Sequence, residues 1–246
     1  RAAGLGSLTK EEDPDEYDKG FAHCDLLVIG AGPAGLMAAL TAGRAGARVI
    51  LADEDFRMGG RLNAESFEVG GQAGADWAAA AVAELASLPN VRLMNRTTIV
   101  GAFDHGIYSA VERVSDHLAV PAAGKPRQTL WRIYSKRAIL AGGATERPIA
   151  FENNDRPGVM LAGALRAYAN RWGVAAGDRV AVFTNNDDGL RTARDLQAKG
   201  VDVAAVIDSR TGGELLPGIR HLQGAQVVDS SGRLGLKSIT VRTANG

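Results

Sequence analysis

Residues 25–54 read DLLVIGAGPAGLMAALTAGRAGARVILADE. DLLVI is a short apolar run that ends in glycine, residues 33–44 carry a helical pattern, and ARVILAD is a second apolar run. A strand, a helix and a second strand within about 30 residues are typical of a right-handed parallel crossover. The stretch therefore predicts the first unit of an α/β fold with a parallel sheet.

The turn between the first strand and the helix reads GAGPAG. Gly30 permits a tight turn, Gly32 lets main-chain N–H groups approach a pyrophosphate, and Gly35 lets the helix pack close to the strand. Pro33 suits the first helical turn, and Ala34 lies beside the phosphate contact. The helix N-terminus adds a partial positive charge. Because the motif stands between a strand and a helix, it predicts an adenine-dinucleotide site.

An acidic trio follows the second strand. Asp53 stands where a carboxylate accepts hydrogen bonds from the hydroxyls of the adenosine ribose. Glu54 and Asp55 follow it, and with no basic residue among them the three acids would repel the extra phosphate of NADP. The alternative, a glycine turn that only connects a strand to a helix, is disfavoured because the turn and the acid coincide. The sequence favours a dinucleotide with an unphosphorylated ribose.

Two further segments are candidates for the same site. Gly60 and Arg61 follow the second strand and could place a backbone N–H or the guanidinium near the diphosphate, although Arg61 could equally be a solvated surface residue. Ile99 is in a third strand that ends at the carboxyl edge of the sheet, where ligands of open α/β folds bind. It could press on the adenine and hydrogen-bond it through its backbone, or it could be an ordinary core residue.

The whole chain divides into three predicted parts. Residues 1–24 are polar and acidic in their middle and are typical of a linker or surface arm. Residues 25–150 form the N-terminal part of a first dinucleotide-binding domain, and residues 151–246 form a second, inserted, Rossmann-like domain. Further elements of the first domain are a helix at 74–88, a third strand at 91–103 and an antiparallel ribbon within 99–141.

The second domain is predicted to repeat the crossover. Its elements are a helix at 160–172, strands at 179–184 and 201–208, a helix at 188–199 and a last strand at 236–243. The turn that corresponds to the phosphate turn, residues 184–189, contains Asp187, Asp188 and only one glycine. Two acids would oppose a pyrophosphate, so we expect a degenerate copy without a ligand. The last strand lacks the element that should follow it, and we therefore expect a fragment of a longer protein.

The composition limits the classes of partner. Lys plus Arg and Asp plus Glu are equal at 28 each, so no summed charge would gather nucleic acid or an anionic membrane. Cys24 is the only cysteine, so the dithiol of a disulfide reductase is absent and a reducing compartment is expected. No apolar run of about 18 residues and no signal-peptide stretch occurs, which predicts a cytoplasmic protein.

Four segments carry a family resemblance. GAGPAGL, ILADEDFRMGG, RAILAGGATERP and ENNDRPGVMLAGALRAYANRWGV occur in an order that resembles the alpha subunits of heterotetrameric sarcosine oxidases. The first and third segments are shared widely among two-dinucleotide flavoproteins of the glutathione reductase type, whereas the fourth is more particular. The resemblance covers nearly the whole chain and implies a three-layer, glutathione reductase-like domain.

The resemblance also implies a function. In that family the module resembles a binder of NAD rather than FAD, with FAD in the beta subunit, FMN between alpha and beta, and a folate-binding region near the alpha C-terminus. The complex, which also has gamma and delta subunits, oxidises sarcosine to glycine, passes one carbon to tetrahydrofolate or releases formaldehyde, and reduces oxygen to peroxide. Residues that match positions lining the NAD are Ala34, Asp53, Glu54, Asp55, Arg61 and Ile99.

Two other functions compete with this interpretation. A stand-alone flavoenzyme with FAD in the first site and NADH in the second would need a competent second glycine turn. A scaffold that has lost its ligand would not need the intact first turn or Asp53. We therefore expect a dinucleotide-binding portion of an amine oxidase complex with no catalytic side chain of its own. The sequence leaves open whether NAD or FAD occupies the first site.

Overall fold

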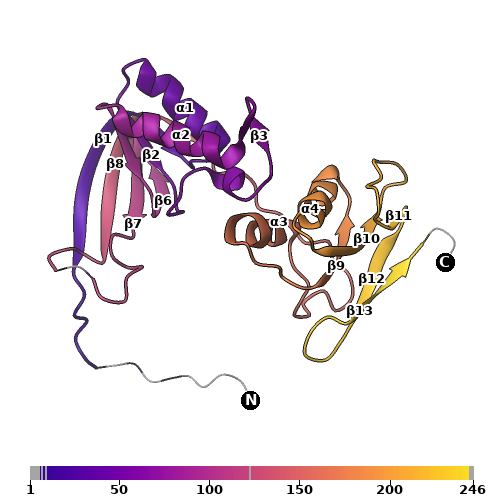
Figure 1. The fold of residues 1–246 in the computed structure, drawn as a ribbon. Helices are drawn as coiled ribbons and strands as arrows, with labels where there is room; N and C mark the ends of the chain where they lie inside the picture. Colours follow the sequence, from indigo (N-terminus) through magenta and orange to yellow (C-terminus); the bar gives the residue numbers. More distant parts are fainter. Residues whose placement is uncertain (1–5, 7, 9, 122, 244–246) are drawn as a thin grey trace.

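The computed structural model describes residues 6, 8, 10–121 and 123–243, which form two lobes side by side (Figure 1). The first lobe holds a six-stranded sheet in the order β5-β2-β1-β8-β7-β6. Strands β5, β2, β1 and β8 are parallel, whereas β7 and β6 are antiparallel to their neighbours. Their bounds are β1 Tyr17–Ile29, β2 Val49–Ala52, β5 Val91–Met94, β6 Thr97–Phe103, β7 Ile107–Glu112 and β8 Gln128–Leu140.

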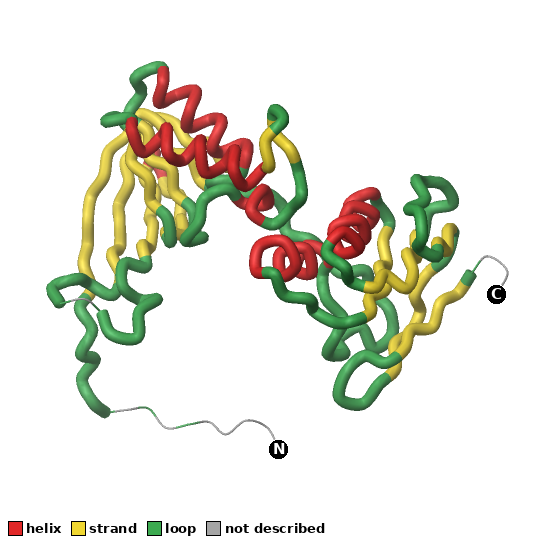
Figure 2. The backbone as a smooth tube through the Cα atoms, in the orientation of Figure 1, coloured by secondary structure: helices red, strands yellow, loops and turns green. Residues whose placement is uncertain are grey.

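Two helices cover one face of this sheet (Figure 2). They are α1, Pro33–Arg44, and α2, Gly74–Ser87, which match the predicted helices closely. Leu36 and Leu40 of α1 and Leu85 of α2 are buried against Val28 and Leu51 of the central strands. The short elements between them are η1 Gly60–Asn63, β3 Glu68–Val69 and β4 Gln72–Ala73. The predicted crossover and α/β class are confirmed.

The first strand begins earlier than predicted. Residues 17–24 pair with β8 from Tyr17↔Gln128 to Cys24↔Ser135, so they are the first half of β1. The expectation that residues up to 24 form a linker is therefore wrong for this stretch. Its exposed side chains include both polar residues and Phe21, and the pairing partner lies more than a hundred residues away in sequence, so the strand has little local signal. Most of residues 1–9 lie outside the described residues.

The predicted third strand is two strands. β5 ends at Met94 and β6 begins at Thr97, and between them Arg96 takes a φ of +54°. This left-handed residue separates the two strands, and β6 pairs with β7 at the far edge of the sheet. The 3-10 turn η2, Asp104–Gly106, closes the β6–β7 hairpin. The predicted antiparallel ribbon is confirmed.

The second lobe has a three-stranded parallel sheet in the order β11-β10-β9 and a separate hairpin of β12 and β13. The predicted crossover is present as β9 Arg179–Thr184, α4 Asp187–Ala198 and β10 Asp202–Asp208. The predicted helix at 160–172 is α3 Ala162–Arg166, which continues as the π-helical turn η3 Ala167–Arg171. Strands β11 His221–Gln223 and β12 Gln226–Ser231 were not predicted, whereas β13 Ser238–Arg242 was.

Candidate functional site

The glycine turn at the carboxyl end of β1 needs two of its glycines for steric reasons. Gly30 has a φ of +99°, and a Cβ there would lie 2.5 Å from the carbonyl oxygen of Ala141. A Cβ at Gly35 would collide with the carbonyl oxygen of Gly30. These contacts hold α1 close to β1 and β8, as the sequence predicts.

Gly32 is different, because a Cβ built on it would meet no atom within 4 Å. It is the N-cap residue of α1, with a φ of −69° that any residue adopts, and no side chain caps the helix. The first turn contains no acidic residue. The first helical N–H groups have no partner within the helix, so the turn opens onto space where an anion can accept their hydrogen bonds. A pyrophosphate fits this cradle.

The segment after β2 supports the turn from the other side. The amide of Gly59 donates to the carbonyl of Ala31 at 2.8 Å, and a Cβ at Gly60 would lie 2.9 Å from the Cα of Gly32. The buried Asn63 side chain donates to the carbonyls of Arg57 and Met58 and so holds this loop. Asn63 carries no signal in the sequence, because a single asparagine in a loop gives no pattern.

Asp53 lies directly behind the glycine turn. One carboxylate oxygen accepts a hydrogen bond from the amide of Ala31 at 2.5 Å, and the other accepts one from the amide of Asp55 at 2.8 Å. Its own amide donates to the carbonyl of Met94, which fixes the residue at the ends of β2 and β5. An ionised carboxylate has about four acceptor positions, so both oxygens can still accept bonds from ribose hydroxyls.

The other two acids are not free of basic neighbours. Asp55 accepts hydrogen bonds from Arg171 at 2.6 and 3.0 Å, and this guanidinium holds the pKa of the Asp55 carboxyl below its usual value. Arg113 donates to the backbone carbonyl of Glu54 at 2.7 Å, while the Glu54 side chain is exposed. No basic residue stands among the three acids in the sequence, but the fold brings Arg171 of the second lobe beside Asp55.

Arg61 points toward the second lobe. Its guanidinium donates to both carboxylate oxygens of Asp188, at 2.9 and 3.0 Å, and also pairs with Glu65. Asp188 in turn accepts a bond from Arg166 at 2.7 Å. Arg61 thus forms an ion pair across the junction between the two lobes, although most of its side chain is exposed.

Ile99 lies on β6, next to the carboxyl ends of β2 and β5. It is half-buried and packs against the cluster that contains Ala52 and Met94. It therefore packs near the end of β2, the strand that the acidic trio follows. Its position is compatible both with the core role and with contact to an adenine ring.

The turn of the second crossover has a different construction. A Cβ at Gly189 would collide with the Thr184 side chain, so this glycine serves close packing. The Asn186 side chain caps α4 by accepting from the amide of Asp188 at 3.0 Å. Burial raises the pKa of Asp188, but Arg166 and Arg61 outweigh burial and leave the pKa below its usual value. An ionised acid already occupies this helix N-terminus.

The described part of the chain gives little support for a nucleophilic cysteine, a metal site or a membrane-spanning helix. Cys24 is buried, and burial raises the pKa of its thiol, which makes it a poor nucleophile. Among the described residues, no group of His, Cys, Asp and Glu side chains could hold a metal ion. The helices found there are also too short or too polar to cross a bilayer.

Known proteins resemble the chain at the sequence level. The family described as FAD dependent oxidoreductase matches residues 25–86. The alpha subunit of sarcosine oxidase from Rhizobium meliloti (strain 1021) is 57% identical over 210 residues, which are 85% of this chain and 21% of that protein. Its counterpart from Corynebacterium sp. (strain P-1) is 47% identical over 235 residues, which are 92% of this chain and 24% of that protein.

The chain is a relative of the sarcosine oxidase alpha subunits. The resemblance predicted from the four segments is therefore confirmed. The chain spans less than a quarter of the length of these alpha subunits. A third relative, the sarcosine oxidase alpha subunit of Corynebacterium sp. (strain U-96), is 47% identical over 210 residues, which are 85% of this chain and 22% of that protein.

Solved structures share the fold of the chain. L-proline dehydrogenase from P.horikoshii has a TM-score of 0.70 at 24% identity, over 96% of this chain and 41% of that chain. Thioredoxin reductase of Lactococcus lactis has a TM-score of 0.64 at 15% identity, over 89% of this chain and 71% of that chain. At such identities the likeness concerns the fold alone, which is the predicted glutathione reductase-like type.

Proposed function

We propose that this chain is the adenine-dinucleotide-binding part of a sarcosine oxidase alpha subunit. The observation that carries the proposal is the open space at Gly32, in front of an uncapped helix N-terminus with Asp53 behind it. If the turn bound no ligand, a larger residue could stand at position 32, because a Cβ there meets no atom.

Each proposed contact follows from the position of its residue. The N–H groups of Ala34 and Gly35, in the first turn of α1, and the backbone at Gly60 would receive the pyrophosphate. Asp53 would accept the ribose hydroxyls, with Glu54 at its side. Ile99 would contact the adenine. In this proposal Asp55 and Arg61 shape the site through their partners in the second lobe.

NAD is the proposed occupant, and FAD is the alternative because both present the same adenosine diphosphate. NAD fits a site that holds a structural dinucleotide, and the chain has no dithiol that could exchange electrons with a flavin. The matched FAD dependent oxidoreductase family supports a dinucleotide or flavin cofactor without favouring NAD. FAD in this site would supply two-electron redox chemistry.

The activity of the whole protein is also a proposal. As part of a sarcosine oxidase with beta, gamma and delta subunits, the chain would belong to a cytoplasmic complex that oxidises sarcosine to glycine. FAD and FMN elsewhere in that complex, and tetrahydrofolate as the one-carbon acceptor, complete the proposed reaction. The residues of this chain would bind and orient a dinucleotide and would not contact sarcosine.

A stand-alone NADH oxidoreductase is the second candidate function. It would need a second nucleotide on α4, where the N-terminus is already capped by Asn186 and carries Asp187 and Asp188. These acids favour the first candidate, since they would repel a pyrophosphate.

Spectroscopy and calorimetry together test the proposal. The purified chain should show no flavin absorption in the blue region and should bind one NAD per chain. Bound flavin would replace NAD by FAD as the occupant, and two saturable NAD sites would favour the second candidate. Peroxide formation from sarcosine by the 246 residues alone would contradict the non-catalytic role.

A further inference from the structure

The loop beside the phosphate cradle reaches from the glycine turn to the second lobe. Gly59 and Gly60 contact the turn at one end of this loop, which continues through η1 to Ser66. Helices α3 and α4 lie on the side of the second lobe that faces it (Figure 1). Residues 59–66, the cradle loop, therefore stand between the proposed pyrophosphate site and the second lobe.

Asp195 of α4 holds the end of the cradle loop. One oxygen of its carboxylate accepts a hydrogen bond from the hydroxyl of Ser66, and the other accepts one from the side-chain amide of Asn170 at 2.9 Å. The same amide donates to the carbonyl of Ala64 at 3.0 Å. Because the amide nitrogen carries two hydrogens, it can serve both acceptors. Two residues of the loop are thus fixed to α4 and η3.

Asp188 holds the start of the loop from the same face of the helix. Asp188 and Asp195 are seven residues apart on α4, which is about two turns, so both project toward the first lobe. The carboxylate of Asp188 accepts hydrogen bonds from Arg61 at 2.9 and 3.0 Å. The buried Arg166 pairs with Asp188 at 2.7 Å and lies 3.7 Å from Glu65. Helix α4 therefore binds the cradle loop at two points.

These contacts between the lobes are polar, and water can replace them. Asp195 is only 8% exposed, and the side chains that donate to its carboxylate, Ser66 and Asn170, are uncharged. If the lobes separated, water would hydrogen-bond the same groups, so docking gains little net free energy from them. Polar junctions between domains commonly allow relative motion. A ligand that favours the docked arrangement can therefore shift the balance.

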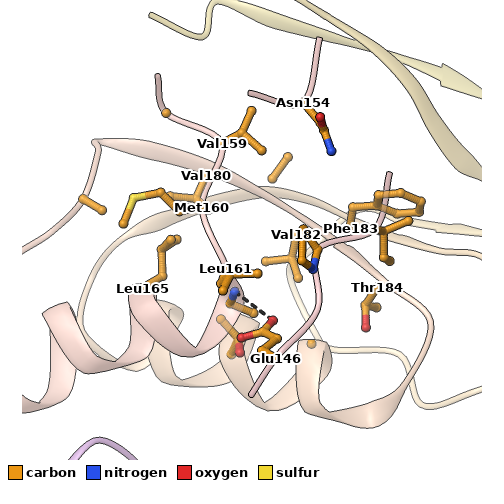
Figure 3. Close-up of a pocket in the computed structure, with 18 of the residues that line it drawn as sticks. Glu146, Asn154, Val159, Met160, Leu161, Leu165, Val180, Val182, Phe183 and Thr184 are labelled. Carbon is orange, nitrogen blue, oxygen red and sulfur yellow. Dashed lines mark hydrogen bonds between the residues drawn. The ribbon is translucent and has the colours of Figure 1, made fainter. Parts of the chain in front are cut away.

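The turn that precedes α4 borders a pocket that does not suit a pyrophosphate. Thr184, which begins this turn, lines a pocket of about 850 Å³ in the second lobe (Figure 3). The wall along β9 is apolar at Val180 and Val182, and Asn186 already caps the helix. Asp188 also borders the pocket, yet its carboxylate is bound by the two arginines of the junction. The acid that would repel a phosphate here thus serves the contact with the first lobe.

We propose that α4 positions the dinucleotide site of the first lobe. Asp188 and Asp195 are positioning residues that hold the cradle loop against the glycine turn, where the backbone at Gly60 faces the pyrophosphate. The inference rests on the proposed function, because it assigns α4 a role in binding the same dinucleotide. A crossover that no longer binds its own nucleotide thereby regulates the affinity of the other site.

The coupling must act in both directions. If docking of α4 raises the affinity for the dinucleotide by a given factor, the bound dinucleotide stabilises docking by the same factor. Coupling of this kind typically changes affinities about 5- to 150-fold. A dinucleotide in the first lobe should therefore protect residues of the second lobe that it does not contact.

Calorimetry on the full-length polypeptide that contains these residues tests the affinity. NAD and FAD are titrated into the unsubstituted protein, and the one that binds is used with the variants. Asp195→Ala should weaken its binding at least about fivefold, the low end of such coupling, with unchanged stoichiometry. Ser66→Ala should act in the same direction from the side of the first lobe. The unchanged stoichiometry distinguishes a weaker site from a partly unfolded protein.

Asp187→Asn is the matched control on the same helix. The side chain of Asp187 is 72% exposed and pairs with Arg210 of the second lobe, so it lies outside the junction. This variant should bind the dinucleotide as tightly as the unsubstituted protein does. Full affinity in Asp195→Ala, or an equal loss in Asp187→Asn, would overturn the proposal.

Hydrogen exchange gives a readout that local packing alone would not change. In the unsubstituted protein the dinucleotide should slow exchange in the glycine turn, residues 30–36, and also in residues 162–171 of α3 and η3. In Asp195→Ala it should slow exchange in the glycine turn only. Protection confined to the glycine turn of the unsubstituted protein would overturn the coupling and leave the proposed function intact. Failure of both NAD and FAD to bind the unsubstituted protein would refute the proposed function and this inference with it.

Discussion

Arg171 donates two hydrogen bonds to Asp55 and so connects the second lobe to the loop that follows β2. The pair lies close to Asp53, whose carboxylate accepts from the amide of Asp55. A residue at the proposed ribose site is thus held by a cation from the other lobe. The charge of the site depends on both lobes, which the first crossover alone does not reveal.

The glycine turn gives the first prediction, in which Gly32→Ala weakens NAD binding and Gly35→Ala lowers stability. Gly32→Ala should leave the thermal midpoint almost unchanged, because its φ suits alanine and its Cβ meets no atom. It should weaken NAD binding at least tenfold, about 1.4 kcal/mol, because the methyl group occupies the pyrophosphate space. Calorimetry measures the affinity, and unchanged NAD binding would refute the phosphate assignment.

Gly35→Ala is the matched control for that experiment. Its Cβ would collide with the carbonyl oxygen of Gly30, so the helix must move away from the strand. The variant should lose thermal stability whether or not NAD is present. Equal stability of the Gly32 and Gly35 variants would show that the turn is packed differently.

Asp53 gives the second prediction. Asp53→Ala should weaken NAD binding by roughly 1.5 to 3 kcal/mol, the range for hydrogen bonds to a charged group. It should also lower the thermal midpoint, because the amides of Ala31 and Asp55 lose their acceptor. Glu54→Ala, at an exposed neighbouring side chain, should have a smaller effect on both measurements. Full NAD affinity in a folded Asp53→Ala variant would remove the ribose role.

The junction gives the third prediction, because Arg166 is only 2% exposed and its nearest carboxylate is Asp188 at 2.7 Å. Asp188→Ala leaves this buried charge with Glu65 at 3.7 Å and should cost roughly 3 kcal/mol of unfolding free energy. Arg61→Ala removes a mostly exposed partner and should cost less than about 1 kcal/mol. Denaturant unfolding of both variants checks the difference, and equal costs would contradict it.

Local patterns and distant contacts explain what the sequence could and could not predict. The turn at Gly30, α1 and the β9–α4–β10 crossover follow from glycine spacing and apolar periodicity within short windows. The pairing of Tyr17 with Gln128 and the contact of Arg171 with Asp55 join segments more than a hundred residues apart. Patterns within a short window of sequence cannot predict such contacts. The break between β5 and β6 at Arg96 was not predicted because a non-glycine residue adopts the left-handed conformation there.

The Arg171–Asp55 pair gives the last prediction, which concerns the choice between NAD and NADP. Asp55→Ala removes one acid near the proposed ribose and frees the Arg171 guanidinium, which can then pair with a 2′-phosphate. The ratio of the NADP and NAD dissociation constants should fall about tenfold, or about 1.4 kcal/mol. The double variant Asp55→Ala with Arg171→Gln lacks the cation and should recover most of the preference for NAD. If the ratio stays unchanged in Asp55→Ala, or falls equally in the double variant, Arg171 does not reach the ribose and its pair with Asp55 only joins the lobes.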